Sequence, residues 1–130
     1  MRRRTPLIVA LAMALTLAAC GAPVGEAPGV RTVAAAEAVE QLGGRTIIDV
    51  RTPAETVAGM LDGAVNIDIG AADFSDRIAS LDRDGSYLLY CRSGNRSAQA
   101  ASIMRDLGFT DVIDAGGFDS LAAAGAPTAP

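Results

Sequence analysis

The stretch CRSGNRS, residues 91–97, is the part of the chain whose residue types point most directly to chemistry. It places a cysteine directly after the apolar run YLLY and follows it with two arginines. A thiolate is a good nucleophile, but an ordinary thiol is mostly protonated at neutral pH. The chain contains no histidine, so no imidazole can take the proton from Cys91. Positive potential built into the loop must ionise the sulfur instead.

Three features of this loop supply positive potential. A helix expected to begin near Arg96 and Ser97 directs the positive end of its dipole at the sulfur. Gly94 tolerates unusual dihedral angles, so that consecutive backbone N–H groups can turn inward and bind an anion. Arg92 and Arg96 add two permanent charges. We therefore expect a lowered pKa for Cys91 and a bound substrate anion beside it. The competing interpretation is that Cys91 is an ordinary core residue.

The composition excludes several other classes of function. Cys20 and Cys91 are the only cysteines and form no CxxC pair, which excludes thioredoxin-type chemistry. Without histidine, a transition-metal site of the usual kind is not expected, and no other cofactor is predicted. A net charge of −4 argues against nucleic acid as a partner, because phosphates require a basic surface.

The N-terminus has the pattern of a secretion signal. Basic MRRR precedes the apolar stretch Leu7–Ala19, which is too short for a free-standing membrane span. Because Cys20 directly follows Leu-Ala-Ala, residues 1–19 resemble a bacterial lipoprotein signal, and that resemblance implies cleavage before Cys20 and lipidation of its thiol. The alternative is an ordinary cleaved signal with an incidental cysteine.

The residues after this signal predict where the protein resides. Residues 20–30 are rich in Gly, Pro and Ala and are expected to form a flexible tether. The predicted location is the cell membrane, through the lipid on Cys20, with the domain on the extracytoplasmic side.

The cysteine loop must be positioned by a strand before it and a helix after it. Strand-like and helix-like stretches alternate along residues 31–125. The strand candidates are Arg45–Val50, Ala64–Ile67, Ser86–Tyr90 and Asp111–Ala115. The helix candidates are Ala34–Leu42, a helix capped by Thr52 and Glu55, Asp73–Leu81, the helix after the loop, and Gly116–Gly125. This order predicts an α/β domain in three layers, a parallel sheet with helices on both faces, followed by a loose tail at residues 126–130.

Ligands of parallel sheets bind at the carboxyl ends of the strands, where Cys91 is expected. Asp49 and Arg51 follow another strand and reach the same edge. They either support the cysteine loop or form a structural ion pair, Arg51 with Glu55 or Asp49 with a loop arginine. The ion pair is the favoured interpretation.

Several motifs in order make the chain resemble the rhodanese family, the sulfurtransferases with a single catalytic cysteine. The resemblance covers about residues 31–121. Its motifs are IIDVR (Ile47–Arg51), Glu55 with Gly59, DGA and NI (Asp62–Ala64, Asn66–Ile67), YCRSGNRS (Tyr90–Ser97), LGF (Leu107–Phe109) and GGF (Gly116–Phe118). It departs at Met60-Leu61, where most relatives carry histidine and isoleucine or valine. It also departs after the GG turn, where many relatives carry an aromatic residue, often tryptophan, whereas FDSLAAAG (residues 118–125) is poor in bulk.

This resemblance implies a mechanism for the loop. Cys91 becomes a persulfide that passes sulfane sulfur from an anionic donor such as thiosulfate to a thiophilic acceptor. The six-residue active loop then runs from Cys91 to Arg96, with its amides around the sulfur, and Arg92 and Arg96 bind the sulfonate. Further hydrogen bonds to the substrate are expected from Ser93, Asn95 and Ser97.

Two alternatives remain open. Cysteine phosphatases and the related arsenate reductases place an arginine six residues after the cysteine, whereas here that position is Ser97 and Arg96 comes one residue earlier. The other alternative is a non-catalytic or relay module at the membrane surface that hands sulfur to a protein acceptor. The intact Cys91 argues against an idle module.

Overall fold

The computed structural model describes residues 29–130. The predicted signal peptide, Cys20 and most of the tether lie outside the described residues. The tether was predicted to end at residue 30, but Gly29 and Val30 already belong to strand β1 (Gly29–Thr32), which pairs with residues 111–114. The domain therefore begins earlier than predicted, because this strand gains its stability from a distant partner. Within residues 29–130, no helix has the length and apolar character needed to cross a membrane.

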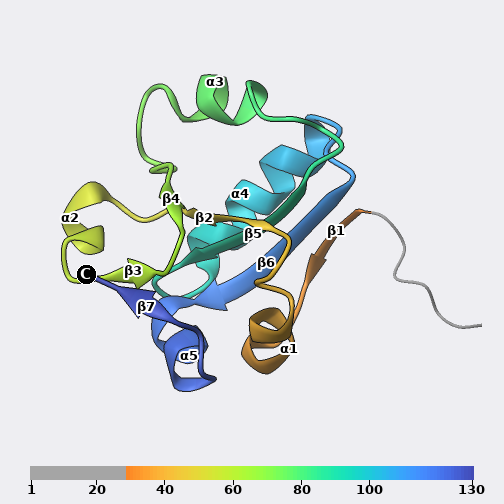
Figure 1. The fold of residues 1–130 in the computed structure, drawn as a ribbon. Helices are drawn as coiled ribbons and strands as arrows, with labels where there is room; N and C mark the ends of the chain where they lie inside the picture. Colours follow the sequence, from red (N-terminus) through yellow and green to blue (C-terminus); the bar gives the residue numbers. More distant parts are fainter. Residues whose placement is uncertain (1–28) are drawn as a thin grey trace, which may run out of the picture.

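A parallel sheet forms the middle layer, as predicted, and it has five strands, one more than the sequence indicated (Figure 1). Its strands lie in the order β1-β6-β5-β2-β4, and every neighbouring pair is parallel. The four strands besides β1 are β2 (Thr46–Asp49), β4 (Val65–Asn66), β5 (Ser86–Cys91) and β6 (Asp111–Gly117). The central strand β5 is buried from Tyr87 to its end, as expected for a parallel strand covered on both faces.

Helices cover both faces of the sheet, which gives the predicted three layers. Helices α1 (Ala35–Glu40) and α5 (Phe118–Ala123) pack on one face, and α3 (Phe74–Ala79) and α4 (Asn95–Asp106) on the other. Alternate residues of β5 serve the two cores, because successive side chains of a strand point to opposite faces. Leu88 packs with α1 and α5, and Leu89 packs with α3 and α4.

The C-terminal residues are ordered, so the predicted loose tail is wrong. Strand β7 (Thr128–Ala129) pairs in antiparallel fashion with β3 (Met60–Leu61). The backbone N–H of Asp62 donates to the carbonyl of Pro127 over 2.8 Å, and Ala126 is buried. Local composition did not reveal this pairing because β3 and β7 lie far apart in the sequence.

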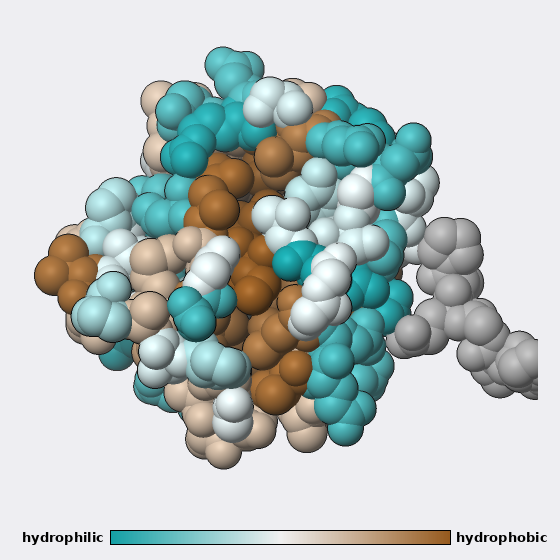
Figure 2. Space-filling model, viewed as in Figure 1, coloured by the Kyte–Doolittle hydropathy of each residue, from teal (hydrophilic) through white to brown (hydrophobic). Residues whose placement is uncertain are grey.

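Figure 2 shows one face of the molecule, on which apolar side chains gather in a stripe down the middle of the view. The edge strand β4 contributes an exposed apolar residue, Val65, to the surface of the molecule. A separate exposed residue, Val57, directly follows the short helix α2 (Pro53–Thr56) and is 82% accessible. Helix α2 lies beyond the carboxyl ends of the strands, beside the cysteine loop.

Candidate active site

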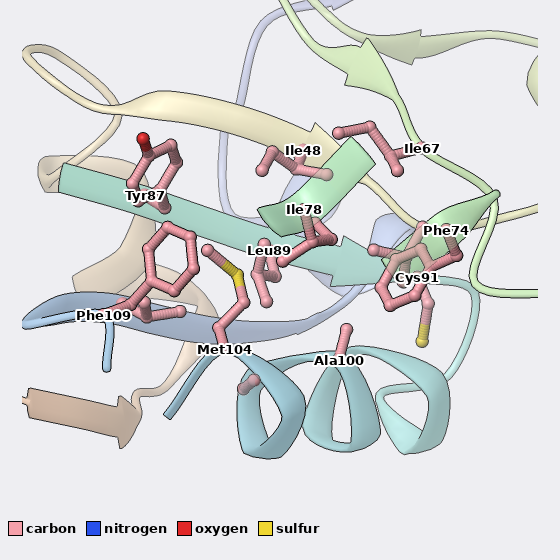
Figure 3. Close-up of a cluster of buried hydrophobic side chains, with 13 residues drawn as sticks. Ile48, Ile67, Phe74, Ile78, Tyr87, Leu89, Cys91, Ala100, Met104 and Phe109 are labelled. Carbon is pink, nitrogen blue, oxygen red and sulfur yellow. The ribbon is translucent and has the colours of Figure 1, made fainter. Parts of the chain in front are cut away.

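Cys91 is the last residue of β5 and lies at the end of an apolar cluster (Figure 3). Its side chain is completely buried. Figure 3 shows the sulfur pointing toward the first turn of α4 and away from the side chains of Ile48 and Leu89. Burial alone would fit an ordinary core residue. The groups around the sulfur therefore decide whether Cys91 is a core residue or a reactive thiol.

Polar groups of the loop surround the sulfur. The backbone N–H of Gly94 donates to Sγ over 3.0 Å, and the thiol lies 3.6 Å from Oγ of Ser97. The Ser97 hydroxyl donates to the carbonyl of Gly94 over 3.0 Å, and because a hydroxyl rotates freely it can turn to donate to a thiolate. Inward-facing N–H groups are thus present, as the sequence predicted.

The balance of burial and hydrogen bonding lowers the pKa of Cys91. Burial raises this pKa, since it disfavours the charged thiolate. Hydrogen bonds from the backbone and side chain of Ser97 and from the backbone of Gly94 and Ser93 lower it by more. The net pKa of the thiol therefore lies below its ordinary value. Helix α4 begins at Asn95, close to the predicted start, and adds its dipole at the same place.

The loop keeps its shape through two glycines. Gly94 has φ of +100°, a conformation that costs other residues about 1–2 kcal/mol, and it turns its own N–H toward the sulfur. Gly117 lies under the loop, where an added Cβ would come within 2.6 Å of the carbonyl oxygen of Arg92. The GG turn of β6 therefore provides the surface on which the loop rests.

Arg96 is held by Glu55 of α2. Its two terminal nitrogens donate to the two carboxylate oxygens, each over 2.7 Å. Oε2 of Glu55 also accepts hydrogen bonds from the backbone N–H and hydroxyl of Thr52, over 3.0 and 2.9 Å, which completes the predicted capping box. The Arg96 guanidinium, with help from Thr52, holds the pKa of Glu55 far below its usual range.

Asp49 and Arg51 form an ion pair with each other, so both pairings suggested for them were wrong. Nη2 of Arg51 lies 2.6 Å from Oδ2 of Asp49 and donates to the carbonyl of Gly59 over 2.7 Å. The guanidinium stacks over the ring of Phe118 at 4.5 Å. Asp49 is completely buried and Arg51 nearly so. The pair connects the end of β2 to the Gly59 carbonyl before β3. It makes no hydrogen bond to residues 91–97.

A cleft of about 430 Å³ lies beside the loop. Its lining residues are Arg51, Ala54, Glu55, Ala58, Arg92, Phe118 and Asp119. Arg92 is exposed, while Cys91 does not line the cleft. Ser93 and Asn95 are also exposed on the loop, and no side-chain hydrogen bond ties either of them to the residues that the structure describes.

Three features of the site were not predicted from the sequence. Glu55 was recognised as a helix cap, but its contact with Arg96 was not foreseen. The support of the loop by Gly117 and the cleft between α2 and α5 were also missed. The GGF motif could have indicated the role of Gly117, because glycine in a strand often marks a place where another backbone approaches closely.

The protein is an α/β protein whose cysteine loop lies between β5 and α4. Comparison with known proteins identifies its family. The rhodanese-like domain family matches residues 34–124. The thiosulfate sulfurtransferase PspE of Escherichia coli K12 is 35% identical over 77 residues, which cover 58% of this chain and 72% of PspE. The thiosulfate sulfurtransferase GlpE of Pseudomonas putida is 37% identical over 78 residues, covering 58% of this chain and 68% of GlpE.

Solved structures agree with this assignment. The crystal structure of a rhodanese-related protein from Thermoplasma volcanium superposes with a TM-score of 0.67 at 33% identity, covering 76% of this chain and 97% of that one. The chain therefore belongs to the rhodanese-like family of sulfurtransferases. Among residues 29–130, no cluster of histidine, cysteine, aspartate and glutamate is arranged to hold a metal ion.

Proposed function

We propose that the protein transfers sulfane sulfur through a persulfide on Cys91. The Cys91 thiolate attacks the outer sulfur of thiosulfate, forming an S–S bond while the original S–S bond breaks and sulfite leaves with its electron pair. A thiophilic acceptor, such as a small thiolate or cyanide, then attacks the terminal sulfur, and the Cys91 thiolate leaves. The cycle predicts ping-pong kinetics.

A single observation carries this proposal, the buried sulfur that accepts hydrogen bonds from its own loop and has a lowered pKa. The same donors suit the persulfide, which is also an anion. The relatives PspE and GlpE are named for thiosulfate, which supports thiosulfate as the donor. A protein that accepts sulfur from Cys91 is equally compatible with the second half of the cycle.

Intact mass spectrometry tests the proposal directly. After incubation of the full chain with thiosulfate, we expect a gain of one sulfur atom and release of sulfite in equal amount, and no gain in the Cys91→Ser variant. Hydrolysis of an aryl phosphate without any gain of sulfur would instead support the phosphatase alternative and reject the proposal.

We further propose that Cys20 is lipidated and holds the domain at the extracytoplasmic side of the cell membrane. The support is the sequence pattern of residues 1–20 alone. Stable anchoring needs more than one acyl chain, so the mature N-terminus is expected to carry several. Expression in a bacterial host should place the chain in the membrane fraction, with the lipid mass on Cys20. A Cys20→Ser variant should leave that fraction, and equal membrane association of both forms would reject the anchor.

A further inference from the structure

The arginines of the domain differ in whether their side chains are hydrogen-bonded to other residues. Across residues 29–130, every arginine except Arg92 forms a side-chain hydrogen bond with another residue, and the chain contains no lysine. Arg92 is exposed, directly follows Cys91 and lines the cleft between α2 and α5. Of the two arginines that line the cleft, Arg51 is paired with Asp49, so Arg92 is the cation of the cleft that is available to an incoming anion.

Arg96, the other loop arginine, is paired with the carboxylate of Glu55. Both terminal nitrogens donate to Glu55. This contact, with smaller contributions from the charges of Cys91 and Asp68, raises the pKa of Arg96. A bidentate carboxylate satisfies the planar fork of a guanidinium. A sulfonate would therefore have to compete with Glu55 for the same two terminal nitrogens of Arg96.

From these contacts we propose that Arg92 binds the anionic end of the donor in the cleft between α2 and α5, while Glu55 uses Arg96 to position the loop. This inference rests on the proposed sulfur transfer for the identity of the donor. It separates the roles of two arginines that the sequence had assigned together.

The cleft has the chemistry for one anion. Arg51 is committed to Asp49, to the Gly59 carbonyl and to the Phe118 ring, and the charge of Glu55 is matched by Arg96. Arg92 and Asp119 remain as the exposed charged groups of the lining. Asp119 therefore weakens anion binding, and its removal should strengthen it.

Equilibrium binding of thiosulfate to a Cys91→Ser background tests the inference without requiring sulfur transfer. In that background, Arg92→Gln should weaken thiosulfate binding by about tenfold or more, as expected for the loss of a hydrogen bond to a charged group. The charge-neutral double variant Glu55→Gln with Arg96→Gln should bind within about threefold of its parent, and Asp119→Asn should bind about two- to threefold more tightly. Arg105→Gln, an exposed arginine remote from the loop, is the matched control.

Steady-state kinetics with Cys91 restored separate binding from positioning. Arg92→Gln should raise KM for thiosulfate, whereas the Glu55/Arg96 double variant should lower kcat with little change in KM. A merely structural loss would instead lower the amount of folded protein, which thermal unfolding of each variant measures.

Two results would overturn the inference: thiosulfate binding that is insensitive to Arg92→Gln, or binding lost in the double variant. If the variants bind thiosulfate as expected but the wild type gains no sulfur, the proposed function is rejected. The assignment of Arg92 as the anion-binding residue is then retained.

Discussion

Cys91 combines complete burial with polar surroundings at its sulfur. The chain has no histidine to act as a general base. Instead, the hydrogen bonds of the loop favour the thiolate form of Cys91 before any substrate binds. The cost is that burial opposes the same ionisation. The balance therefore depends on a few donors, of which Ser97 contributes both its backbone and its hydroxyl.

Replacing Ser97 with alanine should raise the pKa of Cys91, because a donor to the thiolate is lost while burial remains. The lowered pKa keeps more thiolate below the usual titration range of a thiol, so the variant should lose reactivity at neutral pH and regain it as the pH rises. We expect the midpoint of Cys91 alkylation by iodoacetamide to move up by about one pH unit. Ser80→Ala, at the end of α3, serves as control, and an unchanged midpoint in Ser97→Ala would contradict the role given to the hydroxyl.

At the scale of elements, the loop depends on the contact between β5 and β6. The register of these strands shifts near the site, with Leu89 opposite Asp114 but Cys91 opposite Gly117. The shift brings the GG turn beneath the loop, where Gly117 leaves room for the carbonyl of Arg92. On the other side, α2 reaches the loop through the pair of Glu55 and Arg96. Two elements distant in sequence thus fix one short loop.

A Gly117→Ala substitution should disable the loop. Its Cβ would lie 2.6 Å from the backbone oxygen of Arg92, and a backbone atom cannot rotate away as a side chain can. The loop must therefore shift, and the donors to Cys91 shift with it. We expect persulfide formation with thiosulfate to fall by at least about tenfold, since a displacement near 1 Å at a reacting centre can cost more than that. Gly43→Ala, where an added Cβ has open space, is the control; equal rates for the two variants would exclude this role.

For the whole molecule, three layers of helix and sheet surround two apolar cores, and the C-terminal residues close the structure near the site. Strand β7 pairs with β3, which directly follows Gly59. The carbonyl of Gly59 in turn accepts a hydrogen bond from Arg51. The end of the chain therefore supports one wall of the cleft through a series of backbone contacts.

Truncation after Gly125 should lower the free energy of unfolding by about 1–3 kcal/mol. The loss comprises the β3–β7 pairing, the hydrogen bond between Asp62 and Pro127 and the buried side chain of Ala126, and each such hydrogen bond contributes about 1 kcal/mol. Urea unfolding of the full chain and the truncated chain measures the difference. Deletion of the exposed Pro130 alone should have little effect, and an unchanged midpoint in the longer truncation would show that the tail is dispensable.

Much of the fold was predictable because it is encoded in local patterns. The apolar stretch before Cys91 and the capping residues Thr52 and Glu55 each indicate their element without reference to the rest of the chain. The strands β1, β3 and β7 were missed because they lack the apolar, β-branched run that marks β2, and each is stabilised by a partner distant in the sequence.

The amino-acid sequence by itself determined the nucleophile, the loop around it and the parallel α/β class, because these follow from residue type and short-range spacing. Only the tertiary structure decided which charges meet: Asp49 with Arg51, and Glu55 with Arg96. Ion pairs join residues by distance in space, and several acidic residues lay within plausible reach of each arginine along the chain. Because Arg51 and Arg96 are paired in this way, Arg92 is left as the unpaired cation of the cleft and the proposed place where the substrate anion binds.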